Sequence, residues 1–137
     1  MAQYLLDTDI CVELFRHNEL VIKKIETVGI EKCFVSEITI AELFYGAAKS
    51  GNDKNYDDVQ RVQSLFEVVP LRPSLRLYGV NKASLQAKGL TIGEFDLLIG
   101  SCAVYNNLVM VTSNLKHFTN IPNIQLEDWA QKSKLSK

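Results

Sequence analysis

Short apolar runs and helical stripes alternate along this chain. The apolar runs lie at residues 4–6, 33–35, 68–69, 108–111 and 124–126. Runs of this length with little polar interruption are typical of strands that are buried in a parallel sheet. We therefore expect five strands, one at each run.

Between these runs, apolar residues recur at the spacing of a helix face. Val21, Ile25 and Val28 lie at positions i, i+4 and i+7, and a longer stripe covers residues 37–49 before a stop signal at Gly51. Strands and helices alternate without a linker, a repeat or a low-complexity block, so we expect one α/β domain over residues 1–137 with a mostly parallel central sheet. The other predicted helices lie near residues 9–15, 56–66, 73–89 and 93–104.

The composition fits a globular domain. Of the 137 residues, 47% are hydrophobic and 23% are charged, which is enough to build a core without disulfides or a structural metal. The formal net charge is -1. A protein that binds nucleic acid mainly by neutralising phosphates is usually basic, so any nucleic-acid contact here must use a local patch or metal ions.

The chain shows no sign of export. No apolar run approaches the ~20 residues needed to cross a bilayer, and the N-terminus lacks the basic and apolar segments of a signal peptide. Cys11, Cys33 and Cys102 are odd in number and have apolar neighbours, which is typical of reduced, buried thiols. We expect a soluble, cytoplasmic protein without membrane contact.

Three acids occupy positions where apolar residues are expected. Asp7 ends the first strand run, while Glu42 and Asp96 lie inside apolar helical segments. A charge at the edge of a core is costly to desolvate unless it is paired or binds a cation. Mg²⁺ prefers oxygen ligands and needs only one or two carboxylates, which Asp7 and Asp96 could provide, with Glu42 binding a second ion or orienting a water.

Polar residues also follow the fourth strand run, where Thr112, Ser113 and Asn114 come directly after residues 108–111. In a parallel sheet, ligands bind beyond the carboxyl ends of the strands where the strand order reverses. We therefore expect these residues to support the site of Asp7. The same edge would also hold Asp9.

Each acid also fits a structural role. Asp7 or Asp9 could cap the first helix, since Asp is a common N-cap residue. Glu42 and Thr39 form a capping-box pattern, although the stripe predicts that this helix begins earlier, and Asp96 in a first helical turn is favoured by the helix dipole. The joint occurrence of the three acids Asp7, Glu42 and Asp96 favours the metal site.

Four segments together resemble the PIN-domain ribonucleases, and in particular the VapC-type toxins of bacterial toxin-antitoxin pairs. They are residues 6–10 around Asp7, 40–46 around Glu42, 95–99 around Asp96, and 111–118. The resemblance implies a three-layer α/β/α fold and an Mg²⁺- or Mn²⁺-dependent endoribonuclease that cuts structured RNA, such as transfer RNA, to leave 5′-phosphate and 3′-hydroxyl ends. Asp7, Glu42 and Asp96 would be its catalytic and metal-binding residues.

The resemblance also implies partners. These are a second copy of the chain in a homodimer and a VapB-type antitoxin whose basic tail covers the acidic cleft. Phe44, Tyr45 and the predicted helix near residues 56–67 would line the docking groove, unless they pack in the core. Many members of the family carry a fourth carboxylate in the last segment, where this chain has Asn114 and His117. The resemblance therefore fits a site with one metal ion as well as a site with two.

Two other functions fit parts of the pattern. Asp7 and Asp9 match the Asp-x-Asp signature of haloacid-dehalogenase-type phosphatases, with Asp7 as nucleophile and Asp9 as general acid. The chain is short for that fold, and Glu42 would have no role there. The second alternative is a degenerate, non-catalytic PIN-fold binding protein.

Overall fold

The computed structural model describes residues 1–131 of the chain. In this part, five strands form one sheet in the order β3-β2-β1-β4-β5, and every neighbouring pair is parallel. The predicted parallel sheet is therefore confirmed. The strands are β1 Tyr4–Leu6, β2 Cys33–Ser36, β3 Glu67–Val69, β4 Val109–Val111 and β5 Leu126–Glu127.

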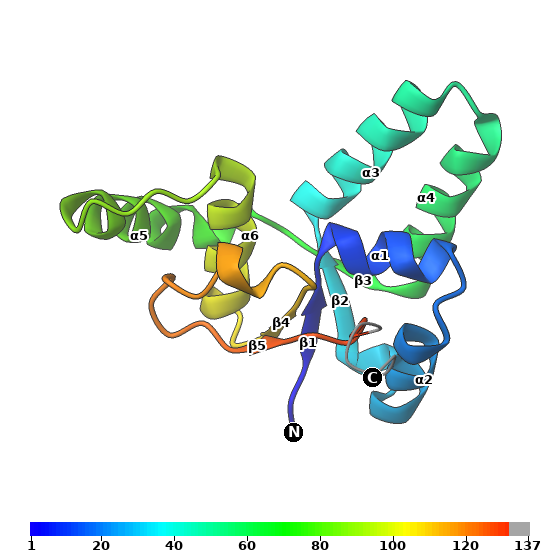
Figure 1. Ribbon diagram of the computed structural model, residues 1–137, viewed down its shortest axis with the longest axis horizontal. Coiled ribbons are helices and arrows are strands. Elements are labelled where there is room, and N and C mark those ends of the chain that lie inside the picture. The colour runs from blue at the N-terminus through cyan, green and yellow to red at the C-terminus, as the bar shows by residue number, and fades with distance from the viewer. Residues whose placement is uncertain (132–137) are drawn as a thin grey trace.

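Helices cover both faces of this sheet (Figure 1), which confirms the expected three-layer α/β/α arrangement. Successive strand residues point to opposite faces, so Leu6 packs in a core with α1 to α4, whereas Leu5 packs in a second core with α5 and α6. The helices are α1 Thr8–Phe15, α2 Glu19–Val28, α3 Glu37–Ser50, α4 Asp53–Leu65, α5 Leu75–Ala87 and α6 Glu94–Tyr105.

Helix α3 begins at Glu37, as its apolar stripe predicted. Its N-cap is Ser36, whose hydroxyl accepts a hydrogen bond from the amide of Thr39 at 3.1 Å. The alternative capping box of Thr39 and Glu42 is therefore not formed, and Glu42 is left without a capping role. Figure 1 shows α3 and α4 side by side as an antiparallel hairpin that projects beyond the sheet.

The strand order reverses at β1, which lies between β2 and β4. There the amide of Asp7 donates to the carbonyl of Val111 at 2.9 Å, and the amide of Thr112 donates to the carbonyl of Glu127 at 3.0 Å. These two bonds align the carboxyl ends of β1, β4 and β5. The polar residues predicted to share one edge of the sheet do so.

The remaining differences from prediction are small. Strand β5 begins at Leu126 rather than at residue 124, because Asn123 has a left-handed backbone with φ 65° and the amide of Ile124 still bonds back to Ile121. The three cysteines are buried free thiols, as expected. Among residues 1–131, no helix combines the length and the apolar character that a membrane span requires.

Candidate active site at the carboxyl ends of the strands

Asp7 is both a helix cap and the most buried acid of the candidate site. Only 6% of its surface is exposed. Its Oδ1 accepts from the amide of Thr8 at 2.8 Å, which caps α1, and its Oδ2 accepts from the hydroxyl of Thr112 at 2.9 Å. The capping alternative is therefore correct for Asp7, but that role occupies only one carboxylate oxygen.

The pKa of Asp7 reflects this crowded environment. Burial is the main cause that raises it, to about 7, and the negative charge of Asp9 is the next. The hydrogen bonds from Thr8 and Thr112 oppose the rise, while the charge of Asp96 adds to it. Asp7 thus lies near two acids, Asp9 and Asp96, whose charges have the same sign as its own.

Asp9 does not cap the helix. Its Oδ2 accepts from the amide of Ser113 at 2.8 Å and from the side-chain amide of Asn114 at 3.2 Å, and it lies 3.4 Å from the Thr112 hydroxyl oxygen. The structure thus brings the three residues after β4 to the two N-terminal acids. Burial raises the pKa of Asp9, and its Oδ1 is buried without a hydrogen-bond partner among the described residues.

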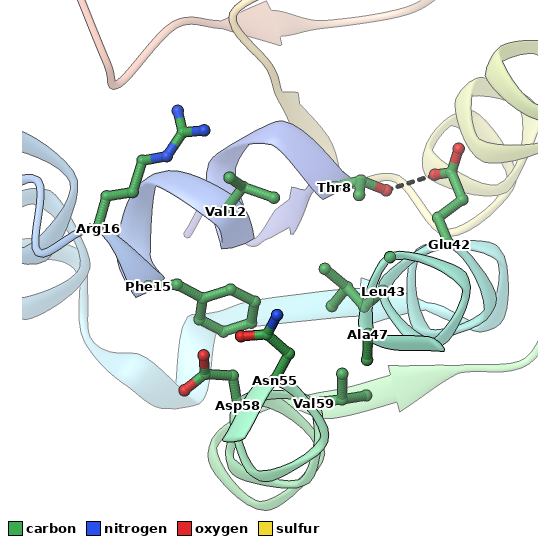
Figure 2. A pocket seen from close by; sticks show the side chains of 11 residues that line it. Thr8, Val12, Phe15, Arg16, Glu42, Leu43, Ala47, Asn55, Asp58 and Val59 are labelled. Carbon is green, nitrogen blue, oxygen red and sulfur yellow. Dashed lines mark hydrogen bonds between the residues drawn. The ribbon is translucent and has the colours of Figure 1, made fainter. Parts of the chain in front are cut away.

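Glu42 reaches the same edge from α3. Figure 2 shows the Thr8 hydroxyl pointing at the Glu42 carboxylate, to which it donates a hydrogen bond. The Thr8 oxygen also lies 3.3 Å from the hydroxyl of the buried Thr39. Thr8 therefore links the segment that follows β1 to the helix that carries Glu42.

Asp96 lies in the first turn of α6, and its helix has no side-chain N-cap. Its Oδ2 is 3.2 Å from Nδ1 of His117, and its charge contributes to the raised pKa of Asp7. The His117 side chain is 58% exposed and so lies at the surface, where its ring contacts a predicted site acid.

Sequence reasoning did not identify two residues of this site, Thr8 and Asp128. The Thr8 hydroxyl bonds to Glu42, and the charge of Asp128, which follows β5, adds to the raised pKa of Asp9. Two signals in the sequence could have identified them. Thr8 lies inside the first acidic segment, and Asp128 comes after the last strand. The contact of His117 with Asp96 has no such signal, because it depends on the turn that follows β4.

The donor chemistry of this site fits a hard divalent cation. Asp7 and Asp96 repel each other, and Asp9 has an unsatisfied oxygen. No group of three His, Cys, Asp or Glu side chains in residues 1–131 is close enough to hold a metal ion as it stands. An ion held here would have at most two of these carboxylates as ligands, with water completing its shell, which is the usual arrangement for Mg²⁺.

The match to known proteins agrees with this geometry. Residues 4–123 match the family model described as the PIN domain. The chain belongs to the PIN-domain family. It is 36% identical over 130 residues to Ribonuclease VapC2 of Rickettsia felis, covering 92% of this chain and 97% of that protein. It is 33% identical over 131 residues to the tRNA(fMet)-specific endonuclease VapC of Salmonella typhimurium, covering 94% and 99%.

Solved PIN-domain structures share the whole fold. The DNA-bound VapBC of Salmonella typhimurium matches with a TM-score of 0.87 at 32% identity, covering 94% of this chain and 99% of that one. VapBC2 from Rickettsia felis, bound to a promoter DNA fragment, matches with a TM-score of 0.84 at 35% identity, covering 92% and 98%. PIN-domain membership confirms the resemblance and removes the phosphatase interpretation of Asp7 and Asp9.

Proposed function

We propose that this chain is the toxin of a type II toxin-antitoxin system, a metal-dependent endoribonuclease that hydrolyses structured RNA. One observation carries the proposal. Asp7 is buried at the point where the strand order reverses, and the charges that shift its pKa are those of the acids Asp9 and Asp96. Such an arrangement is costly without a cation and suits a phosphate-cleaving centre.

In this proposal, Asp7 and Asp96 hold Mg²⁺ or Mn²⁺. The cation, when bound, makes a nearby water more acidic and offsets the negative charge that develops on the phosphate. Thr112 fixes one oxygen of Asp7 by its hydrogen bond, and Asp9 fixes the segment after β4 through the amide of Ser113. These contacts keep the donors oriented before RNA arrives.

We assign the proton transfer to Glu42, because its carboxylate lies at the same edge and the Thr8 hydroxyl orients it. Glu42 accepts a proton from the attacking water, whose oxygen forms a bond to phosphorus while the bond to the 3′ oxygen breaks. The leaving 3′ oxygen takes up a proton from solvent water. The products are a 5′-phosphate and a 3′-hydroxyl, and the RNA 2′-hydroxyl does not react.

The proposed partners are a second copy of the chain and a VapB-type antitoxin. A pocket of about 430 Å³ lies between α1, α3 and α4, and Thr8 and Glu42 are among its lining residues (Figure 2). An antitoxin segment bound in this pocket would therefore contact Glu42. Tyr45 is 67% exposed and available for such docking. Phe44 packs on Tyr56 with ring centroids 6.4 Å apart, so its role is mainly structural.

The test is cleavage of total cellular RNA by purified protein in Mg²⁺, in Mn²⁺ and in EDTA. The wild type should give discrete products only with metal, and their ends should carry 5′-phosphate and 3′-hydroxyl groups. Transfer RNA is the first fraction to examine, since the Salmonella typhimurium relative is named for a transfer RNA. Asp96→Asn should lower the rate at least a hundredfold, since even residues that only orient a metal ligand cost about 10- to 100-fold.

The matched control is Asp57→Asn, which makes the same chemical change at an exposed position of α4. It should cleave at the wild-type rate. If folded, metal-loaded wild type cuts no RNA, the catalytic proposal is wrong and the chain is a degenerate, non-catalytic PIN protein. Equal cleavage activity in EDTA would instead show that the reaction does not depend on a metal ion.

A further inference from the structure

Thr8 lies between two acids of the candidate site and contacts both. It is the first residue of α1, and its backbone amide donates a hydrogen bond to Oδ1 of Asp7 at 2.8 Å. Its side-chain hydroxyl donates to Oε1 of Glu42 on α3 (Figure 2). One residue thus joins the acid that follows β1 to the acid on α3.

The direction of the hydroxyl contacts follows from what each group can donate. An ionised carboxylate only accepts hydrogen bonds, so the single hydroxyl hydrogen of Thr8 is the one shared with Glu42. The Thr8 oxygen also lies 3.3 Å from the hydroxyl oxygen of Thr39. Since the Thr8 hydrogen is already used, Thr39 is the donor in this second contact. The three side chains therefore form one chain of hydrogen bonds from Thr39 through Thr8 to Glu42.

The far end of this chain is fixed in the core. Thr39 is fully buried, and its backbone amide donates to the N-cap hydroxyl of Ser36 at 3.1 Å. Thr39 and Glu42 are three positions apart in α3, so they lie on the same face of that helix. The Glu42 side chain is only partly buried and can rotate about several bonds. The hydrogen bonds therefore hold a flexible carboxylate against a fixed hydroxyl.

We propose that Thr8 is a positioning residue that holds the Glu42 carboxylate with Oε2 facing the attacking water, and that Thr39 fixes Thr8 in this role. The inference rests on the proposed function, in which Glu42 accepts a proton from that water. The Thr8 hydroxyl occupies Oε1, and within residues 1–131 Oε2 accepts no hydrogen bond. Oε2 is therefore the oxygen that takes up the proton while the water oxygen bonds to phosphorus.

The test compares two substitutions at position 8 on the RNA that the wild type cleaves. Thr8→Val removes the hydroxyl but keeps the size of the side chain and the amide that bonds to Asp7. It should lower kcat about 10- to 100-fold and leave KM nearly unchanged, because a displacement of about 1 Å at a reacting group can cost about a hundredfold in rate. Thr8→Ser restores the hydroxyl and should recover most of the lost rate.

The matched control is Thr27→Val, which makes the same chemical change at an exposed position of α2. The Thr27 hydroxyl donates only to a carbonyl of its own helix, that of Lys23, at 2.8 Å. This variant should cleave at the wild-type rate. Thr39→Val should cost more than Thr27→Val but less than Thr8→Val, because it weakens the chain and leaves the bond between Thr8 and Glu42 in place.

A double variant separates positioning from a general effect on the fold. Glu42→Gln lacks the proton acceptor, so adding Thr8→Val should not lower its remaining single-turnover rate further, since residues that act as a unit are not additive. If the double variant is slower than Glu42→Gln by the full factor that Thr8→Val costs alone, Thr8 acts independently of Glu42 and the inference is wrong.

A titration with Mn²⁺ gives a readout that does not depend on cleavage. Thr8→Val should bind Mn²⁺ like the wild type, because the bond between the Thr8 amide and Asp7 is kept. Weaker binding would mean that Thr8 acts through Asp7, and it would overturn the inference. Wild-type kcat in folded Thr8→Val would do the same. If Thr8→Val does not fold, Thr39→Val carries the test, and a wild-type kcat in that variant overturns the inference.

Failure of the proposed function gives a different result. In that case the wild type itself cuts no RNA, or Glu42→Gln cuts RNA at the wild-type rate. If instead the wild type is active and Glu42→Gln is not, while Thr8→Val is as active as Thr27→Val, the nuclease stands and only the role of Thr8 is wrong.

Discussion

In the proposed function, Asp7 combines two tasks, helix capping and cation binding, that a sequence pattern presents as alternatives. A carboxylate has two oxygens and about four acceptor positions, so the hydrogen bonds that Asp7 accepts from the Thr8 amide and the Thr112 hydroxyl leave lone pairs for a cation. Asn keeps the acceptor that caps the helix but loses the charge. The substitution Asp7→Asn can therefore separate the capping role from the electrostatic one.

We predict that Asp7→Asn stabilises the metal-free protein at pH 8. The folded pKa of Asp7 is about 7, above its ordinary value of 3.8, so the folded protein loses stability as the pH rises through this interval. The loss is at most about 4 kcal/mol, from about 1.4 kcal/mol per pKa unit. Thermal unfolding in EDTA between pH 4 and pH 8 should show a steeper decline for the wild type than for Asp7→Asn.

Mg²⁺ or Mn²⁺ provides the control for this prediction. Added at pH 8, the ion should raise the melting temperature of the wild type and leave that of Asp7→Asn nearly unchanged, because ligand binding stabilises only the form that binds it. A lower melting temperature for Asp7→Asn at every pH would mean that capping dominates and that the charge of Asp7 is compensated in the folded protein.

The residues that carry charge were the ones that sequence could identify. Asp7, Glu42 and Asp96 stand out because each interrupts an apolar segment. The contact between Thr8 and Glu42 could not be predicted in the same way, since it joins residues 34 positions apart and depends on how α1 crosses α3. The same holds for His117, which reaches Asp96 only because the turn after β4 bends toward α6.

At the scale of elements, apolar periodicity predicted the helices and strands, and it failed where a single backbone angle decides a boundary. The stripe over residues 37–49 predicted both ends of α3 to within one residue, because Ser36 and Gly51 cap the helix. The last strand was displaced because Asn123 takes a left-handed conformation that the apolar pattern does not encode.

The packing of α6 against the segment that contains Phe118 and Ile121 gives a prediction at the scale of elements. Gly100 lies in α6, and a Cβ atom there would collide with Ile121 and press on Phe118, both buried. Gly100→Ala should therefore destabilise the protein by about 1–2 kcal/mol, since overpacking costs more than the improved helix propensity returns. Denaturant unfolding measures the change.

The matched control is Gly79→Ala in α5, where a Cβ atom would meet nothing within 4 Å. This variant should be more stable than the wild type by about 0.5–1 kcal/mol, because Ala loses less backbone entropy than Gly in a helix. If Gly100→Ala is as stable as Gly79→Ala, the segment with Phe118 and Ile121 can shift without cost, and the close packing of α6 on it does not limit stability.

At the scale of the whole molecule, the charge balance limits how RNA can be held. The chain has 15 Lys and Arg residues against 16 Asp and Glu residues, and several of the acids gather at the site itself. A protein that neutralises many phosphates loses about a thousandfold or more in affinity between 50 and 200 mM salt. This chain has no excess of positive charge for such a mode, so a local basic patch or a bound cation must supply the attraction, and the proposed function favours the cation.

We therefore predict a shallow salt dependence of RNA binding. For two or three phosphate contacts, raising the salt from 50 to 200 mM should weaken binding only about 10- to 40-fold. Glu42→Gln in Mn²⁺ is the suitable protein, since it retains Asp7 and Asp96 while cleavage is blocked, and fluorescence anisotropy with labelled transfer RNA measures the affinity. EDTA at 50 mM salt should weaken binding at least as much as the added salt does. A thousandfold loss with salt and none with EDTA would mean instead that a basic surface holds the RNA and that the acids act only in cleavage.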